Sequence, residues 1–467
     1  MRTEHKLGLS GMGLVLLLAS CATTSAHRDY GTVGTLSRSA LPAGAENDLR
    51  GATASDARAL LAQPLSADGA VRIAMLNNRE LRATLRELGV SRGLMVQAGL
   101  LPNPRIELDL RRPTDRTLPL QKEVMVEYDL TDAILAPMRA HAARADLEAH
   151  RLRVAAEVVR FGYSVRETVY AAQAAQGRWN VATRMLDAYA ASRDAARAFH
   201  EAGNITEADL ATQEATYESA RATAAELELD VIRERERLNQ VLGLHGADTL
   251  WKLAPLSGLP AVAELSSDVE RRAVQASLEL QAVKSRARGA QRRADLYRTQ
   301  GILPDISVDV HGEQDESQWE YGGGLSFTVP IFDRKQGLVS AQEADFDAQI
   351  ERAHALGTNI RSSARHLHAR VLSLRQRAEQ YEHVIVPARS RVLEQNLHQY
   401  NAMQIGVFPL LQALRERQDA EIARIDSVRQ YLTARAALDA LLQGVRVSEP
   451  ASATAQLSSA TAAEGGH

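Results

Sequence analysis

An internal repeat constrains this chain more than any other feature of its sequence. Three segments of the first half return in the same order in the second half: Glu80-Leu81-Arg82-Ala83 as Glu279-Leu280-Gln281-Ala282, Leu101-Pro102 as Leu303-Pro304, and Ala145-Asp146-Leu147 as Ala344-Asp345-Phe346. The first and third of these pairs are each 199 positions apart. Matches that keep one order and nearly one spacing indicate a duplicated unit. We therefore expect a first repeat over residues 67–265 and a second over residues 266–447.

Each repeat contains two segments in which apolar and polar residues alternate. They cover residues 106–110 and 124–130 in the first repeat, and 306–310 and 325–329 in the second. Alternation with a period of two predicts strands with one apolar and one wet face. The apolar residues that we expect to face lipid are Ile106, Leu108, Leu110, Val308, Val310 and Phe327. A water-soluble antiparallel hairpin alternates in the same way, so the strands alone leave that alternative open.

The connections within the two strand pairs, residues 112–122 and 313–320, are polar and suit exposed loops. Helical patterns follow each pair, with apolar residues at steps of three, four and seven. No proline occurs between Pro137 and Pro255. A helix from Ile134 to Ala202 would be on the order of 100 Å long at about 1.5 Å per residue. The pattern predicts long antiparallel, coiled-coil-like helices that reverse near Gly203, a length useful to an exported protein that must cross the periplasm.

The number of strands predicts an oligomer if the strands enter a membrane. An open sheet is excluded from lipid because each unpaired N–H or C=O at its edges costs several kcal/mol. Barrels formed by one chain begin at about eight strands, and this chain offers four alternating segments. Copies of the chain would therefore have to pool their strands.

The N-terminus predicts export and a lipid anchor. Arg2 and Lys6 precede an apolar run, residues 7–19, which is too short to span a bilayer and is flanked like a signal peptide. The run ends just before Cys21, the only cysteine in the chain. We expect residues 1–20 to be a lipoprotein signal peptide and Cys21 to be lipidated. An ordinary signal peptide with a chance cysteine is the alternative.

The segments that flank the repeats differ from them in composition. Residues 22–66 are rich in small residues with weak periodicity, which predicts a tether or linker, and residues 448–467 read as a disordered tail. The net charge of −3 does not favour nucleic acid as a partner. No grouping of histidine, cysteine or serine has the spacing of a catalytic or metal site, so we expect no enzyme activity, no cofactor and no metal site.

Four motifs together resemble the TolC family of outer-membrane efflux proteins, over nearly all of residues 67–444. They are Ala70-Val-Arg-Ile-Ala-Met-Leu-Asn-Asn-Arg-Glu-Leu81, Gln97-Ala-Gly-Leu-Leu-Pro-Asn-Pro104, Phe199-His-Glu-Ala-Gly-Asn-Ile-Thr-Glu-Ala-Asp-Leu210 and Tyr400-Asn-Ala-Met-Gln-Ile-Gly-Val-Phe-Pro-Leu-Leu411. The resemblance implies a mainly helical homotrimer with a transmembrane twelve-stranded β-barrel above a periplasmic α-helical tunnel. It implies an outer-membrane location, which Ala22 after the cysteine also favours by resemblance to bacterial lipoproteins.

The same resemblance implies partners and their docking sites. The channel would be a passive conduit that docks a periplasmic adaptor and an energised, proton-driven inner-membrane pump. The two hairpin tips would meet the adaptor and form the periplasmic gate, through Gly203, Asn204, Thr206, Asp209, Met403, Gln404 and Gly406. A periplasmic adaptor lipoprotein and a structural coiled-coil lipoprotein are the alternatives; the first should have one hairpin, and the second leaves the paired strands unexplained.

One departure from the family pattern concerns the gate. Familiar members carry acidic residues just after the second tip, where this chain has Pro409 and Gln412. Asp209 stands at the matching place after the first tip. The opening motif (residues 70–81) and the second-tip motif (residues 400–411) resemble those of the heavy-metal and copper-resistance branch of the family. Metal ions are therefore one candidate cargo, beside drugs and other small molecules.

Overall fold

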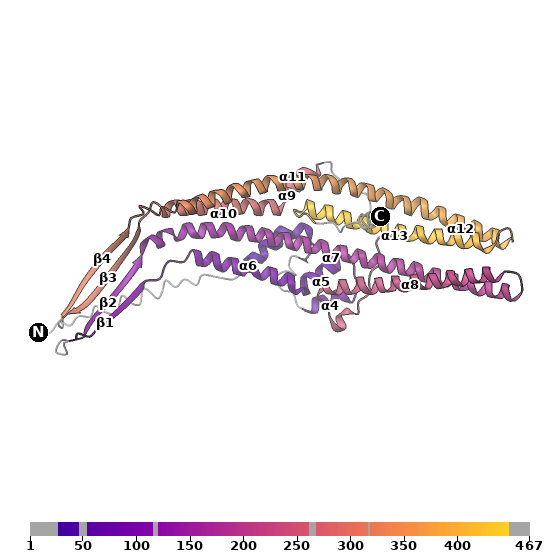
Figure 1. The fold of residues 1–467 in the computed structure, drawn as a ribbon, viewed down its shortest axis with the longest axis horizontal. Helices are drawn as coiled ribbons and strands as arrows, with labels where there is room; N and C mark the ends of the chain where they lie inside the picture. The colour runs from indigo at the N-terminus through magenta and orange to yellow at the C-terminus, as the bar shows by residue number, and fades with distance from the viewer. Residues whose placement is uncertain (1–26, 46–53, 115–119, 261–267, 316–317, 448–467) are drawn as a thin grey trace, which may run out of the picture. The chain divides into compact units, whose positions relative to one another are not determined.

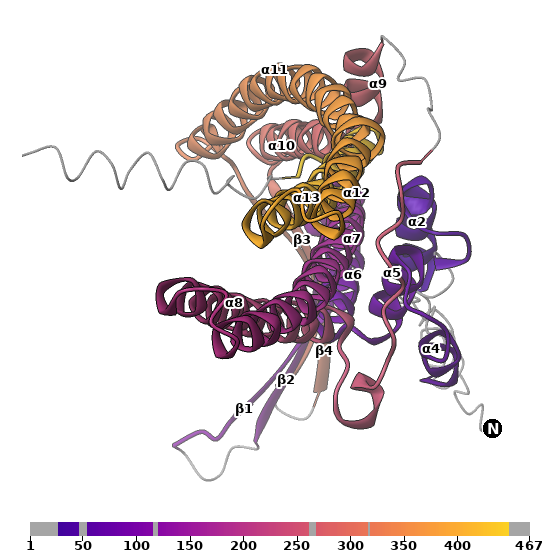
Figure 2. The ribbon, with the colours of Figure 1, turned by 90° about the vertical axis from the view of Figure 1, so that its right-hand side faces the viewer.

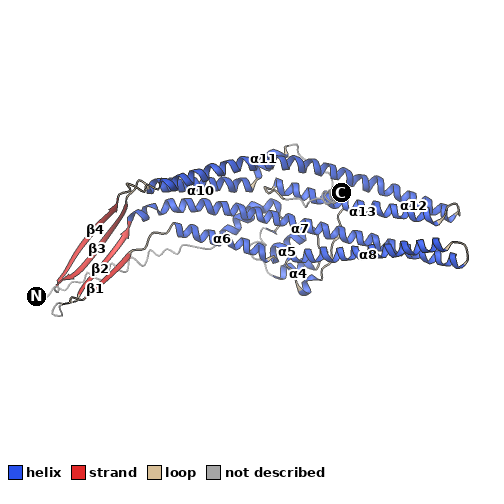
Figure 3. Cartoon of the chain, in the orientation of Figure 1, coloured by secondary structure: helices blue, strands red, loops and turns tan. Residues whose placement is uncertain are grey.

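The computed structural model describes residues 27–45, 54–114, 120–260, 268–315 and 318–447 (Figure 1). The predicted signal peptide, Cys21 and the tail at 448–467 lie outside these ranges. The described chain is mainly helical with four strands, as the sequence predicts, and Figure 3 separates the two kinds of element by colour. Within these ranges no helix has the length and apolarity that crossing a membrane requires.

Both halves of the chain follow the same order of elements. The first contains α5 (Ala67–Asn77), α6 (Arg79–Ala98), β1 (Arg105–Arg111), β2 (Gln121–Asp129), α7 (Leu130–Glu201) and α8 (Glu207–Leu242). The second contains α9 (Val269–Ala276), α10 (Leu278–Gln300), β3 (Asp305–Asp315), β4 (Gln318–Thr328), α11 (Gln336–Gln380), η4 (Tyr381–Ile385), α12 (Val386–Asn401) and α13 (Val407–Leu442). Shorter elements are α2 (His27–Ser37), η2 (Arg38–Ala40), α4 (Ala54–Leu61) and η3 (Gly246–Thr249).

The chain divides into two compact units. The strand unit comprises Met1–Asp29, Leu85–Arg151 and Ala282–Arg352, and so holds all four strands. The tip unit comprises Tyr30–Thr84, Leu152–Gln281 and Ala353–His467. It contains two helical hairpins, α7 with α8 and α12 with α13, which Figure 2 shows nearly end-on.

The four strands form one antiparallel sheet in the order β1-β2-β3-β4, so that β2 of the first repeat pairs with β3 of the second. Residues directly opposite in an antiparallel pair share a face. The register places Val126 opposite both Ile106 and Val310, and Val308 opposite Leu325. Apart from Met125, which pairs with Glu107 and His311 on the polar face, the apolar residues of the four strands therefore lie on one face of the sheet, as the alternation predicts.

The second strand pair is longer than the sequence suggested. Residues 313–320 were expected to form a loop, but Glu313 pairs with Glu320 and Gln314 with Trp319 inside the ladder. This expectation is wrong because polar residues alone do not indicate a loop. The polar face of a sheet tolerates charged residues, and Trp319 has high strand propensity and stacks on Tyr321.

The helices match the predicted hairpins closely. α7 contains 72 residues and ends at Glu201, one residue before the predicted end. The helical path of the second repeat continues through Pro387, which lies at the start of α12. Before it, η4 is a π-turn in which the Val386 N–H donates to the Tyr381 carbonyl, five residues back. Proline lacks an N–H and crowds the carbonyl four residues earlier, so a wider turn at this place lets the helix continue.

Part of the expected tether is packed and helical. Within residues 22–66, Val33 and Ser37 of α2 are fully buried, and so is Asp29. In the strand unit, Asp29 accepts hydrogen bonds from Arg92 on α6 at 2.9 Å and Arg151 on α7 at 2.7 Å. We call these three residues the Asp29 cluster. A buried carboxylate persists only when it is paired, so this cluster fixes the beginning of α2.

Candidate functional site

The two hairpin tips have the same backbone structure, 200 positions apart. At the first tip the Gly203 N–H donates to the His200 carbonyl and the Asn204 N–H to the Phe199 carbonyl, both at 2.8 Å. At the second tip the corresponding donors are Met403 and Gln404, at 2.9 and 2.8 Å. This pair of bonds is a Schellman motif, which ends a helix with one residue in the left-handed region.

That left-handed residue differs between the tips. Gly203 has φ +74° and Met403 has φ +58°. Glycine takes this conformation freely, whereas a residue with a Cβ does so at a cost of roughly 1–2 kcal/mol. Met403 is nevertheless 94% exposed, so packing of its side chain within the described chain does not offset this conformational cost. Strain of this kind, held at an exposed turn, often marks a functional residue.

The helices that return from the tips begin differently. Thr206 caps α8: its hydroxyl accepts from the Asp209 N–H at 3.1 Å, and the Asp209 carboxylate accepts from the Thr206 N–H at 3.1 Å. The Thr206 hydroxyl also donates to the Asp209 carboxylate at 2.7 Å, and this bond, together with that from the Thr206 N–H, holds the pKa of Asp209 below its usual value. At the second tip Gly406 takes the N-cap position without a side-chain bond, and Pro409 replaces the aspartate. At the first tip Asn204 contributes its backbone N–H to the turn.

The tips also differ in charge. The first carries Glu201, Glu207 and Asp209, and the His200 Nε2 lies 3.1 Å from the Glu207 carboxylate across the turn. From Gln399 to Leu414 the second tip has no charged side chain. The chain therefore presents one acidic tip and one uncharged tip on matching backbones.

An apolar groove that the sequence did not reveal lies between the hairpins of the tip unit. Its volume is about 460 Å³, and side chains of both hairpins line it, among them Phe199, Ile205, Leu397, Phe408 and Leu411. The apolar residues belong to helix faces that periodicity alone assigns to a core. Only the fold shows that two such faces leave a groove open between them.

The second surface of interest is the sheet in the strand unit. On its apolar face Ile106, Leu108, Leu110, Val310 and Phe327 are 64–71% exposed, and Val308 is half-buried. A contiguous exposed apolar face of this kind marks contact with a partner or with lipid.

The opposite face of the sheet is acidic. It carries carboxylates on every strand: Glu107, Asp109, Glu123, Glu127, Asp129, Asp305, Asp309, Glu313 and Glu320. Arg111 offsets two of them, with its Nη2 3.0 Å from Asp109 and 3.2 Å from Glu123. Over the described residues, no group of three or more His, Cys, Asp or Glu side chains is arranged to hold a metal ion.

Glycines on β4 make room for two side chains of this acidic face. A Cβ at Gly322 would clash with the His311 ring, and one at Gly324 would clash with the Asp309 carboxylate. His311 and Asp309 therefore lie flat across the neighbouring strand, with Nδ1 of the histidine 3.0 Å from the carboxylate. The glycine run that the sequence contains at 322–324 thus serves close side-chain packing within the sheet.

Comparison with known proteins places this arrangement in a recognised fold. No family model matches the chain. The sequence is 24% identical over 396 residues to the cobalt-zinc-cadmium resistance protein CzcC of Cupriavidus metallidurans, covering 82% of this chain and 90% of that protein.

Solved structures of similar fold are membrane proteins of several bacteria. A membrane protein from Pseudomonas aeruginosa aligns with TM-score 0.70 and 19% identity, covering 80% of this chain and 93% of that one. The open state of the MtrE outer membrane channel of Neisseria gonorrhoeae aligns with TM-score 0.67 and 17% identity, covering 81% and 89%. The outer membrane protein VceC of Vibrio cholerae aligns with TM-score 0.66 and 14% identity, covering 81% and 96%. The chain therefore has the fold of the TolC-type outer-membrane efflux proteins, the family that its sequence resembles.

Proposed function

We propose that the chain is the outer-membrane channel subunit of a tripartite efflux system, a passive conduit that docks a periplasmic adaptor and a proton-driven inner-membrane pump. Three copies pool their strands into a twelve-stranded barrel, and their helical hairpins form a tunnel in the periplasm. The observation that carries the proposal is the four-stranded sheet with one exposed apolar face and one acidic face.

Hydrogen-bond accounting supports the pooling of strands. In one copy the outer edges of β1 and β4 pair with no other strand among the described residues. Pairing β4 of one copy with β1 of the next gives the N–H and C=O groups of both edges hydrogen-bond partners and closes the sheet. A sheet in lipid must be closed in this way because unpaired backbone groups are unfavourable there. The apolar face then contacts lipid, and the carboxylates line the lumen.

The oligomer provides a direct test. The full-length protein, extracted in detergent, should migrate as a trimer before heating and as a monomer afterwards. Reconstituted into a planar bilayer, it should give discrete conductance steps. A monomer that gives no conductance under conditions that preserve its helices would contradict the proposal.

The cargo is proposed from the relative and from charge. CzcC is described as a cobalt-zinc-cadmium resistance protein. The carboxylates of the sheet favour cations electrostatically in an aqueous lumen. We propose divalent metal cations as the cargo. Deleting the gene should lower the tolerance of its host to cobalt, zinc or cadmium; unchanged tolerance to all three would remove metals from the proposal.

Docking of the adaptor is proposed at the tips and at the apolar groove beside them. Gly203→Val tests the first tip, because nothing lies within 4 Å of a Cβ placed there and the change acts only through backbone strain. We expect a local cost of about 1–2 kcal/mol, a normal trimer and reduced crosslinking to the adaptor. The measurement is adaptor crosslinking beside trimer yield in the same membranes.

Met403→Gly is the matched variant at the second tip. It relieves strain and should leave stability equal or slightly higher, by up to about 1 kcal/mol. If it also weakens crosslinking, the exposed thioether side chain is part of the docking surface. Normal crosslinking and normal efflux in both variants would mean that the tips do not dock the adaptor.

Anchoring through Cys21 is the remaining part of the proposal. It rests on the apolar run and the single cysteine that follows it. Labelled palmitate should enter the wild-type protein and be absent from Cys21→Ala, while the trimer still assembles because the barrel provides its own membrane contact. Label that persists in Cys21→Ala would exclude this anchor.

A further inference from the structure

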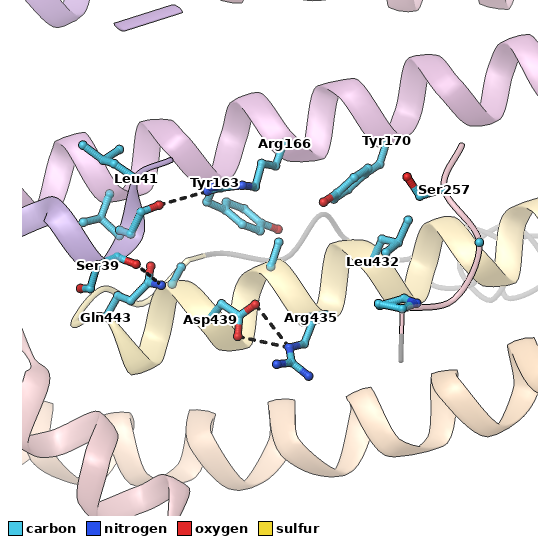
Figure 4. Close-up of a pocket in the computed structure, with 16 residues that line it drawn as sticks. Ser39, Leu41, Tyr163, Arg166, Tyr170, Ser257, Leu432, Arg435, Asp439 and Gln443 are labelled. Atoms are coloured by element: carbon cyan, nitrogen blue, oxygen red, sulfur yellow. Dashed lines mark hydrogen bonds and ion pairs between the residues drawn. The ribbon is translucent and has the colours of Figure 1, made fainter. Parts of the chain in front are cut away.

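A cavity in the tip unit, which Figure 4 shows, has its charged side chains paired within the chain. Its volume is about 450 Å³, and η2, α7, the loop around Gly258 and α13 line it. Arg435 lies 3.2 Å from Asp439, and Arg166 lies 3.1 Å from Asp68. Because these charges offset each other, the cavity indicates no class of ligand. One helix face of the strand unit, in contrast, points to a definite partner.

The second repeat places α10 between α7 and α11 (Figure 1). Arg293 on α10 donates hydrogen bonds to Asp146 on α7 at 2.9 Å and to Gln342 on α11 at 2.7 Å. A Cβ placed on Gly289 would lie 3.6 Å from the Cβ of Ala145, so α10 and α7 are in close contact there. This contact joins the two repeats inside one chain, because α7 belongs to the first repeat and α10 to the second.

The face of α6 that corresponds to this contact is exposed. Its residues lie 199 positions before those of α10, which is the spacing of the internal repeat. Val90 is 64% exposed and Leu94 is 65% exposed, and Glu87 and Gln97 on the same face are exposed as well. The equivalent residues of α10 are all buried or half-buried: Arg286, Gly289, Arg293 and Leu296. Within the described ranges, nothing covers α6 as α7 covers α10.

The other half of the contact is also repeated and exposed. Ala142, Ala145 and Ala149 on α7 are only 1–6% exposed. The equivalent positions on α11, 199 residues later, are again alanines and are all exposed: Ala341, Ala344 and Ala348. The chain thus has an exposed counterpart of each half of the α10–α7 contact.

The strand order brings these two exposed faces together when the barrel closes. α7 follows β2, α10 precedes β3, and β2 pairs with β3. In the same way α11 follows β4 and α6 precedes β1. Pairing of β4 with β1 of the next copy therefore sets α11 of one copy beside α6 of the next.

We propose that α6 packs on α11 of the neighbouring copy at each seam of the trimer, with Val90 and Leu94 against the alanines of α11. The partner is a second copy of this chain, and the proposal rests on the trimeric barrel proposed above. The seam differs in chemistry from the contact inside the chain, because Leu94 stands where Arg293 forms its ion pair with Asp146. The contact inside the chain is ionic, whereas the seam gains from burial of apolar side chains.

A disulfide across the seam tests the proposal on the full-length protein in membranes. By equivalence with Gly289 and Ala145, Val90 and Ala344 of the neighbouring copy should have Cβ atoms within the range of about 3.5–4.5 Å that a disulfide requires. Val90→Cys combined with Ala344→Cys should give covalently linked dimers and trimers on mild oxidation. Either substitution alone should give none, which also controls for Cys21. Gly289→Cys combined with Ala145→Cys should form its disulfide inside one chain and shows that the oxidation works.

Leu94 provides a second test that needs no disulfide. Leu94→Glu loses the apolar contact and places a carboxylate near Asp345 of the neighbouring copy, so the yield of trimer should fall at least about tenfold. Leu94→Arg is the matched variant and should keep the trimer, because an arginine there can pair with Asp345 as Arg293 pairs with Asp146.

The outcomes separate this inference from the function on which it rests. A trimer without the link between positions 90 and 344, while the Gly289–Ala145 disulfide forms, would overturn the inference and leave the channel standing. So would equal trimer yield in wild type and Leu94→Glu, or a link through one cysteine substitution alone, which would mean that like faces meet. If the Gly289–Ala145 disulfide does not form, the Leu94 variants decide. Absence of any trimer from the wild type would contradict the proposed channel itself.

Discussion

Val308→Arg should prevent most of the protein from assembling in the outer membrane. Val308 lies on the apolar face of the sheet, opposite Leu325 on β4 and Tyr128 on β2. An arginine on the lipid face of a membrane strand costs about 2–4 kcal/mol near the bilayer midplane, and each copy in a trimer would carry that cost. Urea titration of folding into lipid vesicles measures the loss, and trimer yield in membranes reports its consequence.

Ser307→Arg is the matched control, one residue away on the opposite face. Ser307 pairs with Asp129 and Ser326, so an arginine there faces water and a carboxylate. We expect nearly normal assembly. Equal losses from the two substitutions would mean that these strands do not separate lipid from lumen.

Asp29→Ala should be the most damaging single change outside the sheet. It leaves Arg92 and Arg151, whose side chains are only 13% and 20% exposed, without their shared carboxylate. Removing one partner of a buried ion pair typically costs about 3–5 kcal/mol. We expect α2 to become sensitive to protease and the free energy of unfolding in urea to fall by about this amount. Asp68→Ala, which removes the 70% exposed partner of Arg166, should cost at most about 1 kcal/mol.

The effect of Asp29 should depend on pH. Burial alone raises the pKa of Asp29, but hydrogen bonds from Arg92 and Arg151 outweigh burial and hold the pKa below its ordinary value. A carboxyl with a lowered pKa stabilises the folded state above its unfolded pKa of about 3.9, and this stabilisation disappears as pH falls through the folded pKa. The difference in the free energy of unfolding between wild type and Asp29→Ala should therefore reach its full value at neutral pH and become smaller in acid. A constant difference down to pH 2 would show that Asp29 acts through packing alone.

Local sequence rules were sufficient for the elements whose signals are local. The faces of the strands follow from alternation, and the register confirms them. The reversal after α7 follows from the freedom of Gly203 to take positive φ, and the cap of α8 follows from Thr206. These signals involve residues within a few positions of each other, so a single sequence carries them in full.

Features that depend on distant partners could not be predicted in this way. The packed part of the tether depends on Asp29, whose partners lie 63 and 122 positions away. Met403 takes a conformation that its residue type disfavours, so no residue rule would place it at positive φ. The groove and the cavity of the tip unit likewise exist only where faces of separate helices meet. The roles predicted for the tip and lipid-facing residues stay predictions until the experiments above are done.

The π-turn at Tyr381–Ile385 has a consequence for how the two repeats can diverge. A five-residue hydrogen-bonded step contains one residue more than an α-helical step, so the turn is equivalent to a single-residue insertion. The wider turn takes up the extra residue in nearly the same angular advance, so deleting one residue there would restore a regular helix and leave the rotation of α12 relative to α11 nearly unchanged. The same deletion elsewhere in α11 would rotate all of α12 by about 100°, and would change the face that α12 presents to α13 and the direction of Met403. The π-turn thus lets the second repeat carry an inserted residue while it keeps the rotational phase of its tip.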